Sequence, residues 1–215
     1  MQGKTLAAAD IQCQDNQRLH QQLAELSGRF AVMIFNRVSG QLQAYSDKFG
    51  ALALFYHDDA DEYRIGTQLS DIRLQQHYAG QGLYNYFYFH TIPGPDTVWQ
   101  DVFKLEPASY VSLMLDSPPF TAVYWQPQFA HKLASTKSEL ASGLRQALMH
   151  ATASYCDRSE VGCFLSGGLD SSSVVACLAK QSKQPVKTFT IGFAEPGYDE
   201  TAYAKIVADA FNTEH

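Results

Sequence analysis

A short polar loop follows the apolar run 161–165 and has the composition of an anion site. It consists of Ser166, Gly167, Gly168, Leu169, Asp170, Ser171 and Ser172. A chain that turns through two glycines into a helix aims several backbone N–H groups at one point. Helix N-termini attract anions because of these unpaired donors and the helix dipole. The loop therefore predicts an anion site, and phosphate is the natural ligand.

The loop differs from the better known Walker A phosphate motif. Gly162 and Gly167 have Walker A spacing, but Gly168 and Leu169 stand where that motif requires Lys and then Ser or Thr. The lone carboxylate, Asp170, would repel phosphates unless a cation lay between them, so it predicts Mg²⁺ bridging the loop to a polyphosphate. The structural alternative is a glycine turn in which Asp170 only caps the following helix.

The elements around the loop alternate between strand and helix. We expect strands at 161–165 and 186–191, and a helix from Ser171 to about Lys180. A last helix is expected from about Asp199, with a buried stripe that consists of Ala202, Ile206, Val207 and Ala210. This order predicts a parallel sheet, and ligands bind at the carboxyl ends of such strands. The loop lies at one of these ends.

A helix is also predicted before the first of these strands. Thr136 and Glu139 have the spacing of a capping box at a helix N-terminus. The apolar face that follows consists of Leu140, Leu144, Ala147, Leu148 and Ala151. Its periodicity predicts a helix of about four turns.

The first half of the chain reads as strands joined by turns. Strands are expected at 30–35, 41–45, 51–56 and 63–66, with helix somewhere within 69–88 and two short strands within 104–115. Residues 116–130 contain three of the eight prolines and precede the change to helical periodicity. We therefore expect one domain at 1–115, a linker at 116–135 and a second domain at 136–215.

Composition excludes several classes of function. The formal net charge of −6 gives no general attraction for nucleic acid or anionic membranes. No stretch approaches the roughly 18 consecutive apolar residues of a membrane-spanning helix. The start of the chain lacks a secretory signal, which predicts a cytoplasmic protein. The four cysteines form no C-x-x-C pair and the seven histidines show no ligand-like spacing, so a zinc site is not expected.

The loop resembles the pyrophosphate loop of N-type ATP pyrophosphatases, in particular that of the asparagine synthetase family. TFTIGF at 188–193 and the following YDETAYAKIVADAFNTEH resemble the second strand and helix of its synthetase domain. ADIQCQDNQRL, GRFAVMIFNRVSGQLQAYSDKFGALALFY and IPGPDTVWQDVFKLEPASY resemble its glutaminase domain. The resemblance implies an α/β protein: an α+β sandwich remnant of N-terminal-nucleophile type, then part of a doubly wound parallel-sheet domain.

The resemblance also implies a reaction and a set of ATP-binding residues. In this family a carboxylate attacks the α-phosphate of ATP, pyrophosphate leaves, and ammonia or an amine then displaces AMP. Carried over by motif, Ser166, Gly167, Gly168, Ser171 and Ser172 hold the β- and γ-phosphates, and Asp170 holds Mg²⁺. Phe164 and Ile191 take the positions where backbone contacts adenine. No catalytic residue is assigned.

The glutaminase half departs from the family where chemistry is needed. Family members begin Met-Cys-Gly, whereas this chain begins Met-Gln-Gly and has no thiol at that position. The arginine that would hold the glutamine carboxylate aligns with Cys13, and the carboxylate that would hold its amine aligns with Asn36. The family's Arg-Asp pair in the next turn is Ser46-Asp47. We therefore expect no glutamine hydrolysis.

The leading hypothesis is an ATP-dependent, amide-forming ligase that uses a small carboxylate, aspartate or an analogue, with ammonia or an amine. A lactam-forming or peptide-cyclising synthetase of the same superfamily and a non-catalytic nucleotide-binding module are the alternatives. The family's synthetase domain continues beyond His215, so we expect a fragment of a longer enzyme, or else a truncated product. A homodimer is one assembly that the sequence leaves open.

Overall fold

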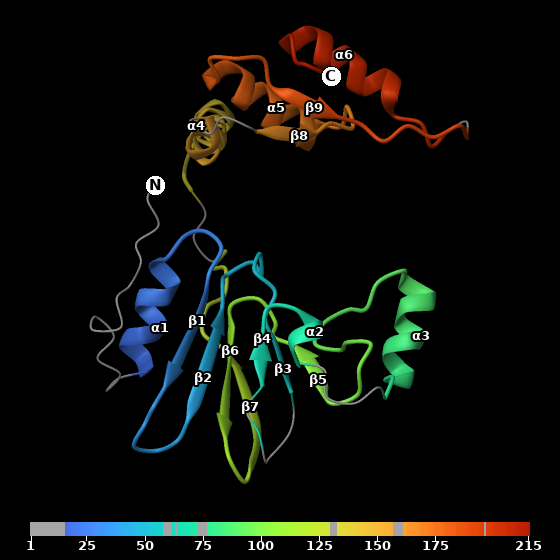
Figure 1. Ribbon diagram of the computed structural model, residues 1–215. Coiled ribbons are helices and arrows are strands. Elements are labelled where there is room, and N and C mark those ends of the chain that lie inside the picture. Colours follow the sequence, from blue (N-terminus) through green and yellow to red (C-terminus); the bar gives the residue numbers. More distant parts are fainter. Residues whose placement is uncertain are drawn as a thin grey trace. The chain divides into compact units, whose positions relative to one another are not determined.

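The computed structural model describes residues 16–57, 62, 64–72, 77–129, 133–156, 161–195 and 197–215. The chain divides into two compact units: the described residues up to Phe129 form one, and those from Leu133 onward form the other. Each unit has its own sheets and helices (Figure 1). Gln2 and Cys13, to which the resemblance gave two glutaminase positions, lie outside the described residues.

The first unit contains two antiparallel sheets. The four-stranded sheet has the order β1-β2-β6-β7, and the three-stranded sheet has the order β4-β3-β5. The strands are β1 (Ala31–Phe35), β2 (Leu42–Ser46), β3 (Phe55–His57), β4 (Ile65–Gly66), β5 (Val102–Lys104), β6 (Ser109–Met114) and β7 (Ser117–Val123). The helices are α1 (Asn16–Glu25), α2 (Leu69–Ile72) and α3 (Gly80–Phe89). This is the α+β architecture expected of a glutaminase-type unit.

The core of the first unit follows from strand alternation. Ala44 on β2 and Val111 on β6 are neighbours in the register, and both point into a buried cluster shared with β3. The other buried members of this cluster are Leu54, Tyr56, Leu105 and Leu113. Residues on the opposite face of the four-stranded sheet pack against α1, whose Leu19 and Leu23 lie one helical turn apart and are both buried.

The segment expected as a linker contains a strand. β7 pairs antiparallel with β6, so residues 117–123 complete the four-stranded sheet of the first unit. The Tyr124 hydroxyl then donates to the Ser46 carbonyl at 2.6 Å. Burial and the charge of Asp47 raise the pKa of Tyr124 to about 12. The two prolines of β7 are tolerated because this strand is at the edge of its sheet.

The second unit alternates helices with two parallel strands. It consists of α4 (Lys137–Cys156), β8 (Gly162–Phe164), α5 (Leu169–Gln181), β9 (Lys187–Phe189) and α6 (Thr201–Phe211). The strands pair in parallel, with Phe164 opposite Phe189. Leu165 and Val175 form a buried cluster with two alanines of α6, Ala204 and Ala208. The strand–helix alternation expected from the sequence is confirmed.

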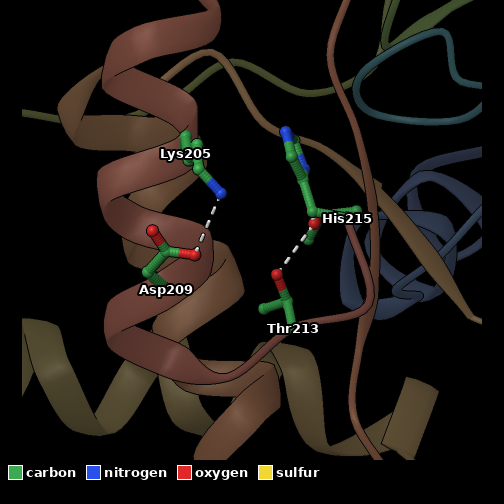
Figure 2. Close-up of polar contacts among 5 residues, drawn as sticks. Lys205, Asp209, Thr213 and His215 are labelled. Atoms are coloured by element: carbon green, nitrogen blue, oxygen red, sulfur yellow. Dashed lines mark hydrogen bonds and ion pairs between the residues drawn. The ribbon is translucent and has the colours of Figure 1, made fainter.

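The residues after α6 add to the sheet. Glu214 forms a parallel bridge with Lys187, and the Thr188 N–H donates to the Glu214 carbonyl at 2.8 Å. The Thr188 hydroxyl lies 2.9 Å from the hydroxyl of Thr213 and 2.9 Å from Nδ1 of His215. Figure 2 shows Thr213 and His215, with Lys205 and Asp209 of α6 beside them.

Two helices bury different residues from those predicted. On α6 the residues Ala202, Ile206 and Ala210 are exposed, and the buried positions are Ala204 and Ala208. The predicted apolar face of α4 is exposed at Leu140, Leu144, Ala147 and Ala151 within the described chain. The capping box is confirmed, because Thr136 and Glu139 exchange hydrogen bonds between side chain and backbone in both directions.

Candidate functional site

The loop of residues 166–172 consists of the turn after β8 and the first turn of α5. Leu165, the last apolar residue before it, is 1% exposed and anchors the loop to the core of the second unit. The helix begins at Leu169, two residues earlier than predicted, and Gly168 is its N-cap with extended backbone. The first backbone N–H groups of α5 have no partner within the helix and are directed along the helix axis at this end. The loop therefore has the geometry expected for anion binding.

Hydroxyl groups hold the loop in its shape. The Ser171 Oγ accepts a hydrogen bond from the Ser166 N–H at 3.3 Å and lies 3.0 Å from the Ser166 Oγ. The Ser166 Oγ also accepts from the Gly168 N–H, and the Ser171 Oγ donates to the Gly168 carbonyl, both at 3.3 Å. These two predicted site residues are therefore brought together by direct contact.

Gly167 is the point of closest approach between the loop and α6. It has φ of +80°, a conformation that side chains other than glycine rarely adopt. A Cβ at this position would lie 2.5 Å from the Tyr203 Cβ and 2.8 Å from the Ala204 nitrogen. The backbone of α6 thus forms one wall of the loop. Small residues on α6 permit this approach, which explains why Ala204 and Ala208, rather than Ile206, face inward.

The side chains of Ser172 and Asp170 have no hydrogen-bond partner in the described part of the chain. The Ser172 Oγ is buried and makes no hydrogen bond. A buried hydroxyl without a partner costs free energy, and a ligand oxygen that reached it would offset that cost. Asp170 is exposed, and neither a hydrogen bond nor an ion pair to its carboxylate is found. Asp170 is not the helix cap, because Gly168 occupies the N-cap position of α5.

The remaining predicted residues lie at the ends of the two strands. Phe164 is the last residue of β8, and Ile191 follows β9 by two residues. Their side chains are 81% and 68% exposed. Thr190, which lies between β9 and Ile191, was not among the predicted site residues. Its hydroxyl donates to the Leu165 carbonyl, directly before the loop. No sequence motif marks this contact, since it joins residues that are 25 positions apart.

The described residues contain no cluster of three or more His, Cys, Asp or Glu side chains that could hold a metal ion. Asp170 is thus the one carboxylate of the loop available for Mg²⁺. This fits the usual coordination of Mg²⁺ in nucleotide sites, where one or two carboxylates and the substrate phosphates bind the ion. Among the helices of the described residues, none combines the length and apolarity that a membrane crossing requires.

The residues predicted at glutaminase positions have structural contacts in the first unit. Asn36 is exposed, and its side-chain oxygen accepts hydrogen bonds from the N–H groups of Val38 and Ser39 in the turn between β1 and β2. The Ser46 hydroxyl donates to the carbonyls of Glu106 and Ser109. Both side chains therefore stabilise turns and strand contacts of their own unit.

Asp47 is the most strongly held carboxylate of the described chain. Its side chain accepts hydrogen bonds from the N–H groups of Phe49, Ala51 and Leu52 at 2.9 to 3.0 Å. Burial alone would raise the pKa of Asp47, but these bonds, with one from the Phe30 backbone, outweigh burial and lower it. Asp47 is 1% exposed, and most of its hydrogen bonds come from its own turn.

The sequence matches two protein families along its length. Residues 16–125 match the family described as "Glutamine amidotransferase domain", and residues 143–215 match "Asparagine synthase". The first match covers just over half of the chain, and the second contains the whole loop. The chain belongs to the asparagine synthetase family. The two matches lie on the two compact units.

Three relatives align with most of this chain. A protein of Methanocaldococcus jannaschii, provisionally named asparagine synthetase (glutamine-hydrolyzing) 2, is 32% identical over 200 residues, which are 89% of this chain and 38% of the relative. Asparagine synthetase (glutamine-hydrolyzing) 1 of Bacillus subtilis is 29% identical over 197 residues, 89% of this chain and 31% of the relative. Amidase chry2 of Gibberella zeae is 24% identical over 208 residues. This alignment covers 87% of this chain and 31% of the relative. The chain spans about a third of the length of these relatives.

Proposed function

We propose that this chain is the ATP-binding part of an ATP-dependent ligase that forms amides. In the proposed reaction, a carboxylate oxygen attacks the α-phosphorus of ATP and the bond to the bridging oxygen breaks, so that pyrophosphate leaves. Ammonia or an amine then attacks the acyl carbon and displaces AMP. The observation that carries the proposal is the open N-terminus of α5, with the buried, unpaired Ser172 hydroxyl beside it.

The loop residues divide the work of binding the triphosphate. Gly167 and Gly168 leave the backbone accessible, while Ser166, Ser171 and Ser172 supply hydroxyls. We assign these five residues to the β- and γ-phosphates. The hydroxyls of Ser166 and Ser171 already bond to each other and to the loop backbone, so they position the loop as well. Catalysis of this kind depends mainly on positioning and on neutralising charge.

Asp170 is assigned to Mg²⁺, and the backbone at Phe164 and Ile191 to the adenine. When bound, Mg²⁺ neutralises charge on the phosphates. An exposed carboxylate next to a helix N-terminus is suited to hold the cation without being neutralised by the protein itself. The two strand-end residues lie on β8 and just after β9, at the edge of the sheet from which the loop emerges.

The first unit is proposed to be a scaffold without glutaminase activity. Asn36 uses its side-chain oxygen to hold the turn between β1 and β2, and an amide there carries no charge to pair with the amine of glutamine. We therefore expect ammonia or an amine as the nitrogen source. The test is glutamate release from glutamine by the full-length protein, and release at a rate coupled to ATP use would contradict this part of the proposal.

The proposed partners are small molecules: a carboxylate, with aspartate as the first choice, and ammonia or an amine. The net charge of −6 supports neither nucleic acid nor an anionic membrane as a partner. We further propose a cytoplasmic location and a homodimer. We also propose that the chain divides into a domain at 1–115, a linker at 116–135 and a second domain at 136–215. β7 falls within 116–135 of this division, although it pairs with β6 of the first unit.

The experiment is isotope exchange of labelled pyrophosphate into ATP by the full-length protein. The proposal predicts exchange only when Mg²⁺ and the correct carboxylate are both present, because the acyl adenylate must form and revert. Aspartate is tested first, followed by other amino dicarboxylates. No exchange with any carboxylate tested, despite tight Mg-ATP binding, would favour a non-catalytic nucleotide-binding module. Exchange that needs no carboxylate would contradict the proposed acyl adenylate.

A further inference from the structure

The peptide bond between Leu165 and Ser166 is held at both of its polar atoms. Its carbonyl accepts a hydrogen bond from the Thr190 hydroxyl, and its N–H donates to the Ser171 Oγ at 3.3 Å. The two hydroxyls come from different elements, one after β9 and the other in the first turn of α5. This peptide is the first of the loop, so its plane sets the direction in which the loop leaves the sheet.

Thr190 reaches this carbonyl because of the strand register. Phe164 pairs with Phe189, and the Leu165 N–H donates to the Phe189 carbonyl at 2.8 Å. The next residue on the second strand is Thr190, which is half-buried beside Leu165. Its side chain provides the partner for a carbonyl at the point where the two strands end. Leu165 is 1% exposed, so the contact lies at a well-packed position.

The loop hydrogen bonds all depend on this starting direction. The Ser166 Oγ accepts from the Gly168 N–H and contacts the Ser171 Oγ, so a rotation of the Leu165–Ser166 peptide would displace each of these groups. We propose that Thr190 is a positioning residue of the phosphate loop: its hydroxyl fixes the Leu165–Ser166 peptide, and through it the donors that face the ligand. This inference rests on the proposed function only for the identity of the ligand.

The contrast with Thr188 separates positioning from stability. Thr188 lies on β9 two residues earlier, is 2% exposed, and bonds through its hydroxyl to Thr213 and His215. It has no hydrogen bond to Leu165 or to the loop. Replacing either threonine with valine keeps the branched shape and removes one hydroxyl, so the two variants are matched in chemistry and differ in what the hydroxyl contacts.

The first measurement is calorimetric titration of the full-length protein with Mg-ATP and with magnesium pyrophosphate. We expect Thr190→Val to weaken both ligands about tenfold, since one neutral hydrogen bond in a binding loop accounts for a change of this order. Thr190→Ser keeps the hydroxyl and should restore affinity to within about twofold of the wild type. Thr188→Val should leave affinity unchanged, although its unfolding temperature falls. Equal weakening by both valine variants, or no rescue by serine, would overturn the inference.

The second measurement needs no ligand and is hydrogen exchange at the loop amides. Thr190→Val should accelerate exchange of the Ser166 and Gly168 N–H groups about tenfold relative to the wild type, while Thr190→Ser and Thr188→Val should not. If the wild-type protein binds neither ATP nor pyrophosphate, the proposed function fails, and the exchange rates alone decide on Thr190. Unchanged exchange in Thr190→Val would show that its hydroxyl does not position the loop.

Discussion

Two aspartates of this chain lie shortly after strands, yet their surroundings are opposite. Asp47 lies after β2 and is 1% exposed, with three backbone N–H groups of its own turn bonded to its carboxylate. Asp170 lies after β8 and is exposed, without a bonded side-chain partner among the described residues. A carboxylate satisfied by its own turn stabilises a fold. A carboxylate left open beside a helix N-terminus remains available for a cation and its phosphates.

The same contrast extends to the two units that contain them. In the first unit, Asn36 and Ser46, at expected glutaminase positions, make hydrogen bonds to backbone groups of their own unit. In the second unit the loop keeps an unpaired hydroxyl at Ser172 and glycine backbone at its surface. This difference supports the assignment of scaffold to the first unit and ligand binding to the second, and the following substitutions test it.

The largest effect is expected at Gly167. Gly167→Ala places a Cβ within 2.5 Å of Tyr203 on α6 and imposes φ of +80° on alanine. We expect the second unit to lose about 2 to 4 kcal/mol of unfolding free energy and the protein to lose ATP binding. Circular dichroism during urea unfolding measures the loss. Gly168→Ala is the matched control, because its Cβ would approach only the Ser166 Oγ, at 3.3 Å, and should cost less than about 1 kcal/mol. Equal losses in both variants would refute the close approach to α6.

Asp47→Asn is expected to destabilise the first unit alone. The amide would turn an acceptor into a donor facing a backbone N–H, so we expect a loss of about 1 to 3 kcal/mol. Trp99 and Trp125, the two tryptophans of the chain, both belong to this unit, so their fluorescence reports its urea unfolding separately. ATP affinity should stay at the wild-type value. A wild-type urea midpoint for the variant would mean that the turn does not need the carboxylate.

Lowering the pH should remove the contribution of the Asp47 carboxylate to the stability of the first unit. The folded-state pKa of Asp47 is lowered from its ordinary value of 3.8, so below that pH the unfolded chain binds the proton more readily than the folded chain does. Its contribution to stability is therefore complete above pH 3.8 and is lost as the pH falls through the lower folded-state pKa. Tryptophan-monitored unfolding of the wild type should weaken more steeply below pH 4 than that of Asp47→Asn. Parallel curves for the two proteins would contradict this assignment.

The smallest effect is expected on the outer face of α6. Lys205 and Asp209 form an ion pair at 3.5 Å, with both side chains about 70% exposed (Figure 2). Exposed ion pairs contribute little to protein stability. A lysine four residues before the acidic residue is also the weaker orientation on a helix. Lys205→Ala should therefore change the free energy of unfolding by less than about 0.5 kcal/mol. Thermal unfolding followed by circular dichroism checks this. A loss above about 1 kcal/mol would show that the surface of α6 contributes more than its exposure suggests.

The sequence predicts local features of this fold well. The apolar run before two glycines predicts the strand, the loop and α5, and Thr136 with Glu139 predicts the cap of α4. Each of these signals arises between residues fewer than six positions apart. The N-terminus of α5 lies two residues before the predicted start at Ser171. The reason is that Gly168 takes the N-cap position without a side-chain hydrogen bond.

Features that depend on tertiary contact were not predicted. Helical periodicity placed Ile206 in the core, but α6 approaches the loop at Gly167 and its fully buried residues are Ala204 and Ala208. The strand expected at 51–56 begins only at Phe55, because Asp47 holds the N–H groups of Ala51 and Leu52 in a turn. The role of Thr190 comes from a hydrogen bond between residues 25 positions apart, which the residue types alone do not reveal.

The most direct test of the account is the effect of Mg²⁺ on ATP affinity in the wild type and in Asp170→Asn, measured by calorimetry on the full-length protein. Asp209→Asn, an exposed change on α6, serves as the control. If Asp170 holds the cation against the phosphates, Mg²⁺ should strengthen ATP binding about tenfold or more in the wild type and the control, and hardly at all in Asp170→Asn, with unchanged unfolding temperatures. The same magnesium dependence in Asp170→Asn as in the wild type would contradict the account.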